Sequence, residues 1–188
     1  RDHTEIMLKS FGADINTIKE NESKIIKVKG KKELKSKNIV IPSDLSSSAF
    51  FIVASLINQN SLLKLKNINI NPTRDGILRA LDLMGGNIKI ENKRFINHEL
   101  IADIEVKSSN LKGCELDKNM AKLMIDEYPI LSVAASFASS PSIFRGRKEL
   151  RIKESDRLEL IRINLENCGV KCKVIEDDLF IYPQKNYY

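Results

Sequence analysis

The chain has 188 residues, of which 42% are hydrophobic and 30% charged, as is ordinary for a soluble globular protein. The longest apolar run, residues 49–57, has about half the length that a membrane helix needs, and three cysteines make no even disulfide framework. We therefore expect a cytoplasmic protein with unpaired thiols and no membrane span. The net charge of +6 favours an anionic partner such as nucleic acid, lipid or a phosphorylated metabolite.

The first predicted element is a helix over residues 2–12. Asp2 is a good N-cap, because its carboxylate can accept a hydrogen bond from the first turn, and a glutamate three residues later completes a capping box. Apolar residues recur at helical spacing until Gly12, which suits the left-handed end of a helix. The lysine-rich residues 29–37 then read as an exposed turn.

A strongly apolar helix is predicted to start at Asp44. Residues 75–85 repeat the pattern of the first helix from aspartate to glycine, and residues 87–91 alternate as a half-buried strand does. A second strongly apolar helix is predicted to start at Asp126, and Pro129 fits its first turn, where the missing N–H costs nothing.

The last predicted helix, residues 156–169, again runs from a capping aspartate to a glycine, and residues 170–174 again alternate as a strand. The chain thus repeats a unit of helix, strands, helix and strand over roughly 60–80 residues. Such units predict an α/β (α+β) fold in which helices pack on one face of mixed or antiparallel sheets. The third copy would run past the last residue, so we expect a fragment that is incomplete at both ends.

The densest charge lies in Lys153-Glu154-Ser155-Asp156-Arg157, where a carboxylate stands between cations at the start of a predicted helix. This arrangement suits a site that holds an anion while giving it a proton. Each of these charged residues, and Asp126, also has a simpler structural explanation in the local sequence. Glu154 is a good helix-start acid, the cations suit a solvated surface, and Asp126 is a good N-cap.

Three stretches of the sequence resemble the 5-enolpyruvylshikimate-3-phosphate synthase family. They are residues 1–8 (RDHTEIML), 125–131 (IDEYPIL) and 150–158 (LRIKESDRL). The resemblance runs along the whole chain in the family's order and covers a little under half of a complete enzyme.

The resemblance implies two lobes, each built from three βαβαββ units with helices packed under mixed sheets. Residues 1–41 would finish the last unit of the first lobe. Residues 42–188 would cross over and supply two units of the other lobe, the second of them truncated.

The implied reaction transfers the enolpyruvyl (1-carboxyvinyl) group of phosphoenolpyruvate to the 5-hydroxyl of shikimate 3-phosphate and releases phosphate, in chorismate and aromatic amino-acid biosynthesis. The resemblance implies no metal, organic cofactor, nucleic acid or membrane partner, and a full-length monomer. We expect the 188-residue chain alone to be inactive, because parts of the family's site would lie outside it.

The resemblance also assigns roles to five residues. Asp126 matches the aspartate that faces the 5-hydroxyl as the base, and a helix start should keep it ionised. Glu154 matches the acid that protonates the methylene carbon, which needs a raised pKa. Lys153 matches a contact to the shikimate substrate, and Arg157 matches a phosphoenolpyruvate ligand whose planar fork suits a carboxylate or phosphate. Arg1 lies where the family holds the shikimate phosphate.

Other charged residues receive plainer expectations. Arg147 and Arg151 are expected to face solvent. His3 is expected on a helix surface and His98 in a loop, neither with a partner that suggests catalysis. Asp44 is expected to act as a helix cap, at the point where the chain crosses between lobes.

Two other functions stay open. UDP-N-acetylglucosamine enolpyruvyl transferase shares the implied fold but lacks the K-E-S-D-R sequence. A basic RNA-binding module would also suit repeated α/β units, although such sites usually pair cations with exposed aromatic side chains. Only 6% of this chain is aromatic and it contains no tryptophan, which disfavours RNA.

Overall fold

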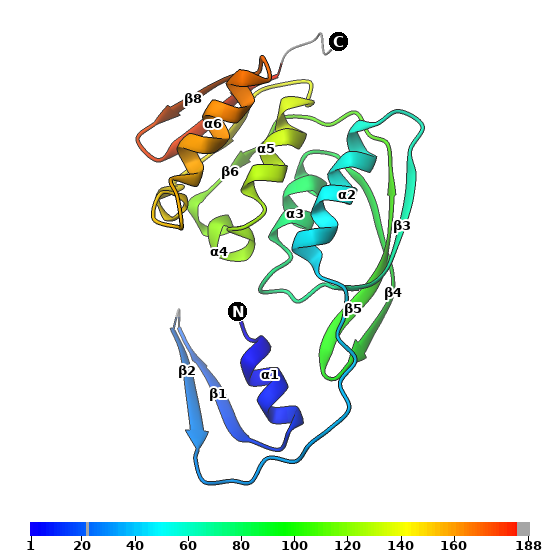
Figure 1. Ribbon diagram of the computed structural model, residues 1–188, viewed down its shortest axis with the longest axis vertical. Coiled ribbons are helices and arrows are strands. Elements are labelled where there is room, and N and C mark those ends of the chain that lie inside the picture. The colour runs from blue at the N-terminus through cyan, green and yellow to red at the C-terminus, as the bar shows by residue number, and fades with distance from the viewer. Residues whose placement is uncertain (22, 184–188) are drawn as a thin grey trace.

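The computed structural model describes residues 1–21 and 23–183. An exposed segment without helix or strand, residues 30–42, divides the chain into an amino-terminal unit (residues 1–29) and a main body (residues 43–183). Figure 1 shows the amino-terminal unit as a separate lobe of blue elements below the rest of the molecule.

The amino-terminal unit contains one helix and one hairpin. Helix α1 (His3–Ser10) is followed by the antiparallel strands β1 (Asp14–Glu20) and β2 (Ser23–Lys29). Gly12 has a φ of 92° just after α1, as predicted for the residue that ends this helix. The hairpin is largely exposed, and Ile15 is its one described residue that is fully buried.

The first half of the main body is built around a three-stranded antiparallel sheet. Its elements are α2 (Leu45–Ile57), β3 (Leu62–Asn69), α3 (Gly76–Leu83), β4 (Asn87–Ile96) and β5 (Glu99–Lys107). The strand order is β3-β5-β4, and a parallel bridge from Ser43, the residue after the exposed segment 30–42, to Ile68 attaches the chain to β3. The predicted strand at residues 87–91 is therefore confirmed as the start of β4.

The second half repeats this plan with a four-stranded mixed sheet. Its main elements are β6 (Glu115–Leu116), α5 (Tyr128–Ser136), β7 (Ser142–Phe144), α6 (Arg157–Asn167), β8 (Lys171–Ile175) and β9 (Asp178–Tyr182). The strand order is β6-β7-β9-β8, with β6 parallel to β7 and the other pairs antiparallel. All six elements of a β-α-β-α-β-β unit are present, whereas we expected this copy to be truncated.

Three short helices lie in the loops of this second half. They are η1 (Lys118–Met120), α4 (Ala121–Met124) and η2 (Lys148–Leu150). The first two lead from β6 to α5, and η2 begins the loop between β7 and α6.

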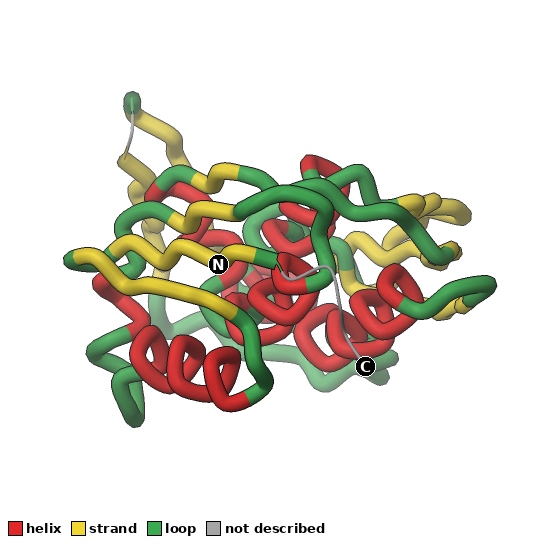
Figure 2. The backbone as a smooth tube through the Cα atoms, turned by 90° about the horizontal axis from the view of Figure 1, so that it is seen from above, coloured by secondary structure: helices red, strands yellow, loops and turns green. Residues whose placement is uncertain are grey.

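The two sheets of the main body lie on opposite sides of its helices (Figure 1; Figure 2). Helix α2 packs on α5, and α5 packs on α6 and α3. Helix α2 is apolar over most of its surface, and Ala49, Ile52, Val53 and Leu56 are buried between its neighbours. The α/β fold with mixed and antiparallel sheets is therefore confirmed.

The predicted aspartate caps form at α2 and α6 and fail at α1, α3 and α5. Asp44 accepts a hydrogen bond from the Ser47 backbone N–H at 2.7 Å, and Asp156 accepts one from Glu159 at 3.0 Å. Asp2 occupies the N-cap position of α1 but makes no cap bond. The capping box predicted there is wrong, because the Asp2 carboxylate binds Asn71 of the main body instead.

No helix in the described part of the chain is long and apolar enough to cross a lipid bilayer. The three cysteines are free: Cys114 is half-buried, Cys168 is exposed and Cys172 is buried. Burial raises the pKa of Cys114 and Cys172 to about 11, so both thiols stay protonated at neutral pH.

Gly113 precedes β6 at a point where the backbone leaves no room for a side chain. A Cβ there would stand 2.0 Å from the carbonyl oxygen of Pro141. We expect Gly113→Ala to destabilise the protein by about 1–3 kcal/mol, because backbone cannot move aside as a flexible side chain can. Urea unfolding measures this, with Gly30→Ala as the control, since no atom lies within 4 Å of that position. Equal unfolding midpoints for the two variants would contradict the close approach.

Candidate active site

Asp126 lies in the turn between α4 and α5, not at the start of a helix. The N-cap of α5 is Glu127, and Pro129 stands in the first turn as predicted. The expectation that Asp126 begins the helix is therefore wrong by one residue. Its carboxylate is instead placed to accept hydrogen bonds from two arginines that approach it from distant parts of the chain.

One guanidinium group joins the two candidate catalytic carboxylates. Arg157 donates from Nη1 to Oδ1 of Asp126 at 3.1 Å and from Nη2 to Oε2 of Glu154 at 2.7 Å. Arg1 donates from Nη2 to the other oxygen of Asp126, Oδ2, at 3.3 Å. The structure thus brings together Asp126, Glu154, Arg157 and Arg1, three of them from the main body and one from the amino-terminal unit.

Arg157 owes its position to the start of α6. It is the first residue of that helix, and the cap bond from Asp156 fixes the backbone at this point. The side chains of Arg157 and Glu154 are three residues apart and face one another across the helix start. Glu154 and Lys153 precede the helix in an exposed loop, where both side chains are open to solvent.

The pKa of Asp126 lies below its ordinary value. Partial burial opposes ionisation, but the hydrogen bonds from Arg1 and Arg157 and the nearby charge of Lys153 outweigh that effect. The cause differs from the one predicted, because two arginines and a lysine stabilise the charge where a helix start was expected to do so.

The pKa of Glu154 is also lowered, by its own backbone N–H and then by Arg157. Its side chain is 78% exposed, so no burial raises the pKa as the proposed acid role requires. Glu154 is therefore ionised at neutral pH in this state of the protein. A bound anion that competes for Arg157 would remove the main side-chain contact that stabilises this charge.

Arg151 anchors the loop that carries Lys153 and Glu154. It donates from Nη1 to Asp156 at 2.8 Å, from Nε to Asp177 at 3.0 Å, and from Nη2 to the carbonyl of Glu176 at 2.6 Å. The expectation that Arg151 simply faces solvent is wrong, because its side chain clamps this loop to the turn between β8 and β9. The sequence did not reveal this role, because two of the three partners lie 25 and 26 residues further along the chain.

Arg147 is fully buried, contrary to the expectation that it faces solvent. Its guanidinium carbon lies 4.5 Å from the centre of the Tyr128 ring, and Nη2 donates to the carbonyls of Leu116 and Asp117 at 2.9 and 2.5 Å. Burial lowers its pKa. The side chain ties the start of the β7–α6 loop to the core beneath α5.

A polar chain supports the turn that presents Asp126. Arg74 donates from Nη2 to Oγ of Ser46 at 2.7 Å and to Oδ1 of Asp44 at 3.3 Å. Ser46 in turn donates to the buried carboxylate of Glu127, the residue after Asp126. The N-cap residues of α2 and α5 are therefore connected, and Asp44 does more than cap the start of a helix.

The remaining candidates lie apart from this cluster. His3, at the start of α1, donates a hydrogen bond from Nδ1 to Oε1 of Glu99 at 2.7 Å, so it has a partner that the sequence did not reveal. His98 lies in the turn between β4 and β5, as expected. Two carboxylates and three cations at one surface can hold an anionic ligand and move protons to and from it.

The sequence matches a known family along almost its entire length. The family profile described as EPSP synthase (3-phosphoshikimate 1-carboxyvinyltransferase) matches residues 1–187. Curated proteins named 3-phosphoshikimate 1-carboxyvinyltransferase from Cereibacter sphaeroides and Caldicellulosiruptor saccharolyticus are 44% and 48% identical over 97% and 99% of this chain. These matches cover 41% and 43% of the relatives, so the chain spans about two-fifths of their length.

Solved structures agree with the sequence comparison. An EPSP synthase from Acinetobacter baumannii superposes with a TM-score of 0.90 and 40% identity over 99% of this chain and 41% of that one. The enolpyruvyl transferase NikO from Streptomyces tendae superposes with a TM-score of 0.62 at 18% identity, which is a likeness of fold alone. Because the first superposition includes the amino-terminal unit and the main body together, it supports their relative placement.

Replacing the shared guanidinium should change the pKa of both carboxylates. In Arg157→Gln we expect the pKa of Glu154 and of Asp126 to rise, with the smaller rise at Asp126 because Arg1 still contacts it. Carbon-13 NMR titration of the labelled carboxyl groups measures this. Arg145→Gln is the matched control, since its partners are Glu115 and Asp178 at another surface. Unchanged titration of both carboxyls in Arg157→Gln would show that the guanidinium does not bridge them.

Proposed function

The chain belongs to the EPSP synthase family, and on that premise we propose that the complete protein transfers the enolpyruvyl group of phosphoenolpyruvate to the 5-hydroxyl of shikimate 3-phosphate. The observation that supports this most is the shared guanidinium of Arg157, which holds Asp126 and Glu154 at one surface with Arg1 and Lys153 beside them. Both substrates are anions, so such a cluster of cations suits them.

The reaction needs two proton movements. The 5-hydroxyl oxygen forms a bond to the central carbon of phosphoenolpyruvate and loses its proton, while the methylene carbon gains one. The resulting adduct then loses a proton from that same carbon, now a methyl group, while the bond between the central carbon and the phosphate oxygen breaks. The products are the enolpyruvyl ether and phosphate. A group that accepts a proton and a group that donates one must therefore lie on either side of the reacting carbon atoms.

Asp126 is the proposed partner of the 5-hydroxyl. A carboxylate whose pKa is lowered is a weak base, so orientation of the hydroxyl is a large part of the role. In the structure both of its oxygens accept hydrogen bonds from arginines. A hydroxyl group that approaches Asp126 would replace one of these contacts, which frees an arginine for the anionic part of the substrate.

Glu154 is the proposed acid for the methylene carbon. It must gain a proton to act, and its contact with Arg157 opposes that. Nη1 and Nη2 of Arg157 each donate to a carboxylate, and the same two donors could together bind one carboxylate or phosphate of phosphoenolpyruvate. Binding of this substrate to Arg157 would therefore release Glu154 and bring negative charge near it, and both changes raise its pKa.

Arg1 and Lys153 are the proposed contacts to shikimate 3-phosphate. Arg1 reaches Asp126 from the amino-terminal unit, and Lys153 lies near enough to lower the pKa of Asp126. Both cations are thus placed around the carboxylate that would face the 5-hydroxyl. A phosphate group in the same substrate could reach them without moving away from Asp126.

We further propose that residues 1–41 belong to one lobe and residues 42–188 to the other, with the exposed segment as the crossing between them. The acidic and basic groups of both parts come together within one chain, so we propose that the complete protein is a monomer. We also propose that it acts in the cytoplasm. Closing the lobes over the substrates would exclude water from the site and strengthen its electrostatic contacts.

Replacing single groups in the complete protein should separate the proposed roles. Asp126→Asn is expected to lower kcat by about 10²–10⁴, because an amide cannot accept the hydroxyl proton. Lys153→Met is expected to raise the KM for shikimate 3-phosphate by about tenfold, because a charged contact to the substrate is lost. Phosphate release from phosphoenolpyruvate measures both, with Lys148→Met as the control for an exposed lysine in the same loop.

The same assay tests the reaction itself. Phosphate release with UDP-N-acetylglucosamine as the acceptor, and none with shikimate 3-phosphate, would replace the proposed function with the related transferase. A kcat for Asp126→Asn equal to that of the unsubstituted protein would remove Asp126 from the chemistry.

A further inference from the structure

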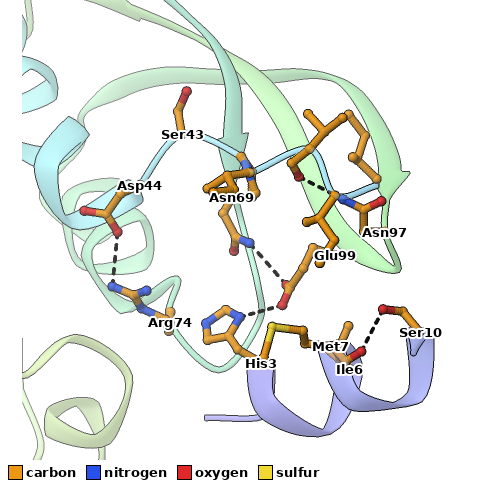
Figure 3. A pocket seen from close by; sticks show the side chains of 15 residues that line it. His3, Ile6, Met7, Ser10, Ser43, Asp44, Asn69, Arg74, Asn97 and Glu99 are labelled. Carbon is orange, nitrogen blue, oxygen red and sulfur yellow. Dashed lines mark hydrogen bonds and ion pairs between the residues drawn. The ribbon is translucent and has the colours of Figure 1, made fainter. Parts of the chain in front are cut away.

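Each of the two parts of the molecule has a carboxylate that is hydrogen-bonded to the other part. From the amino-terminal unit, Asp2 accepts a hydrogen bond from Nδ2 of Asn71 at 2.7 Å. From the main body, Glu99 pairs through Oε1 with Nδ1 of His3 at 2.7 Å. Figure 3 shows Glu99 between His3, on α1, and Asn69, on β3.

On the main-body side, the Asn71 side chain is buried and held in place by hydrogen bonds. Asn71 is 3% exposed, and its Oδ1 accepts hydrogen bonds from the backbone and hydroxyl of Thr73 at 2.8 and 2.7 Å. These bonds fix the orientation of the amide, so that its NH₂ group faces Asp2 and also approaches Oε2 of Glu99. The amide is therefore held in place to receive a carboxylate from the other part of the chain.

Beyond these hydrogen bonds, the facing surfaces of the two parts are not fully packed against one another. An apolar-lined cavity of about 330 Å³ lies between α1, the crossing segment and the β4–β5 turn, with Ile6, Met7 and Ile96 among its walls. Apolar walls give no directional contact, and the open space between them shows that the two parts are not closely packed here. Among residues 1–21 and 23–183, the side-chain hydrogen bonds that join the two parts come from Arg1, Asp2 and His3.

The first of these residues is also the proposed substrate contact. The Arg1 guanidinium lies 3.3 Å from Asp126 and is about one-third exposed, which by itself makes a weak ion pair. Its side chain cannot hold the amino-terminal unit in place. The two residues that follow it are bound to the main body, so they set where the Arg1 backbone lies.

We propose that Asp2, His3, Asn71 and Glu99 form a latch that positions Arg1 over Asp126 and so completes the shikimate 3-phosphate end of the proposed site. The inference rests on the proposed function and names positioning residues for it. It also explains why Asp2 stands at a helix N-cap position without capping the helix. Its carboxylate is committed to the other part of the molecule.

Steady-state kinetics of the complete protein test the latch. Asp2→Ala is expected to raise the KM for shikimate 3-phosphate by about tenfold and to change kcat by less than about threefold, because Arg1 binds substrate and does not move protons. Asp2→Asn keeps an oxygen that accepts the Asn71 amide, so it should recover most of the loss. Lys9→Ala, at an exposed position of the same helix, is the control and should leave both constants unchanged.

A double substitution separates positioning from a general structural effect. In an Arg1→Ala background, Asp2→Ala should raise the KM by less than about twofold, because the residue through which the latch acts is gone. The same proportional increase in both backgrounds would overturn the proposal. So would an unchanged KM in Asp2→Ala.

A distance measurement that needs no substrate distinguishes this failure from failure of the proposed function. Spin labels at Lys27→Cys and Lys122→Cys, with the exposed Cys168 replaced by serine, report the spacing of the two parts. We expect one narrow distance distribution with Asp2 or Asp2→Asn and a broadened one with Asp2→Ala. A narrow distribution in Asp2→Ala overturns the latch. Absence of turnover by the unsubstituted protein would overturn the proposed function, and the label distances would still decide the latch.

Discussion

A single guanidinium group shared by two carboxylates organises this site. Asp126 comes from a turn before α5 and Glu154 from a loop before α6, and Arg157 is hydrogen-bonded to both. The contact lowers the pKa of each acid and keeps the two groups at one surface. The other features described here, from the cap at Asp156 to the clamp at Arg151, fix the backbone around that contact.

The sequence predicted the elements that depend on local signals. The helix over residues 156–169 and the strand after it follow from a capping aspartate, apolar spacing and a terminal glycine, and all of these act within one or two turns. The same local rules failed at Asp2 and Asp126, where a distant partner competed for the side chain. Asp2 and Asp126 both suit a helix cap, but Asn71 binds one and two arginines bind the other.

Only some residues of the candidate site could be predicted from the sequence. Position alone would have made Asp126 and Glu154 ordinary acids near helix starts, and the resemblance to a family singled them out. Arg147 and Arg151 lie in the same charged stretch, and composition gave no reason to separate them from solvent-exposed arginines. Their partners are carbonyl groups, an aromatic ring and an acidic turn brought near by the fold, which no spacing in the sequence records.

The exposed segment between the two parts carries four lysines, Lys31, Lys32, Lys35 and Lys37. Solvent-exposed backbone outside helices and strands is what proteases cleave most readily, so trypsin is expected to cut first within this segment. A cut would remove the tether that keeps the local concentration of each part high around the other. After such a cut, the two parts would be held together by noncovalent contacts alone, and they would separate when the protein is diluted.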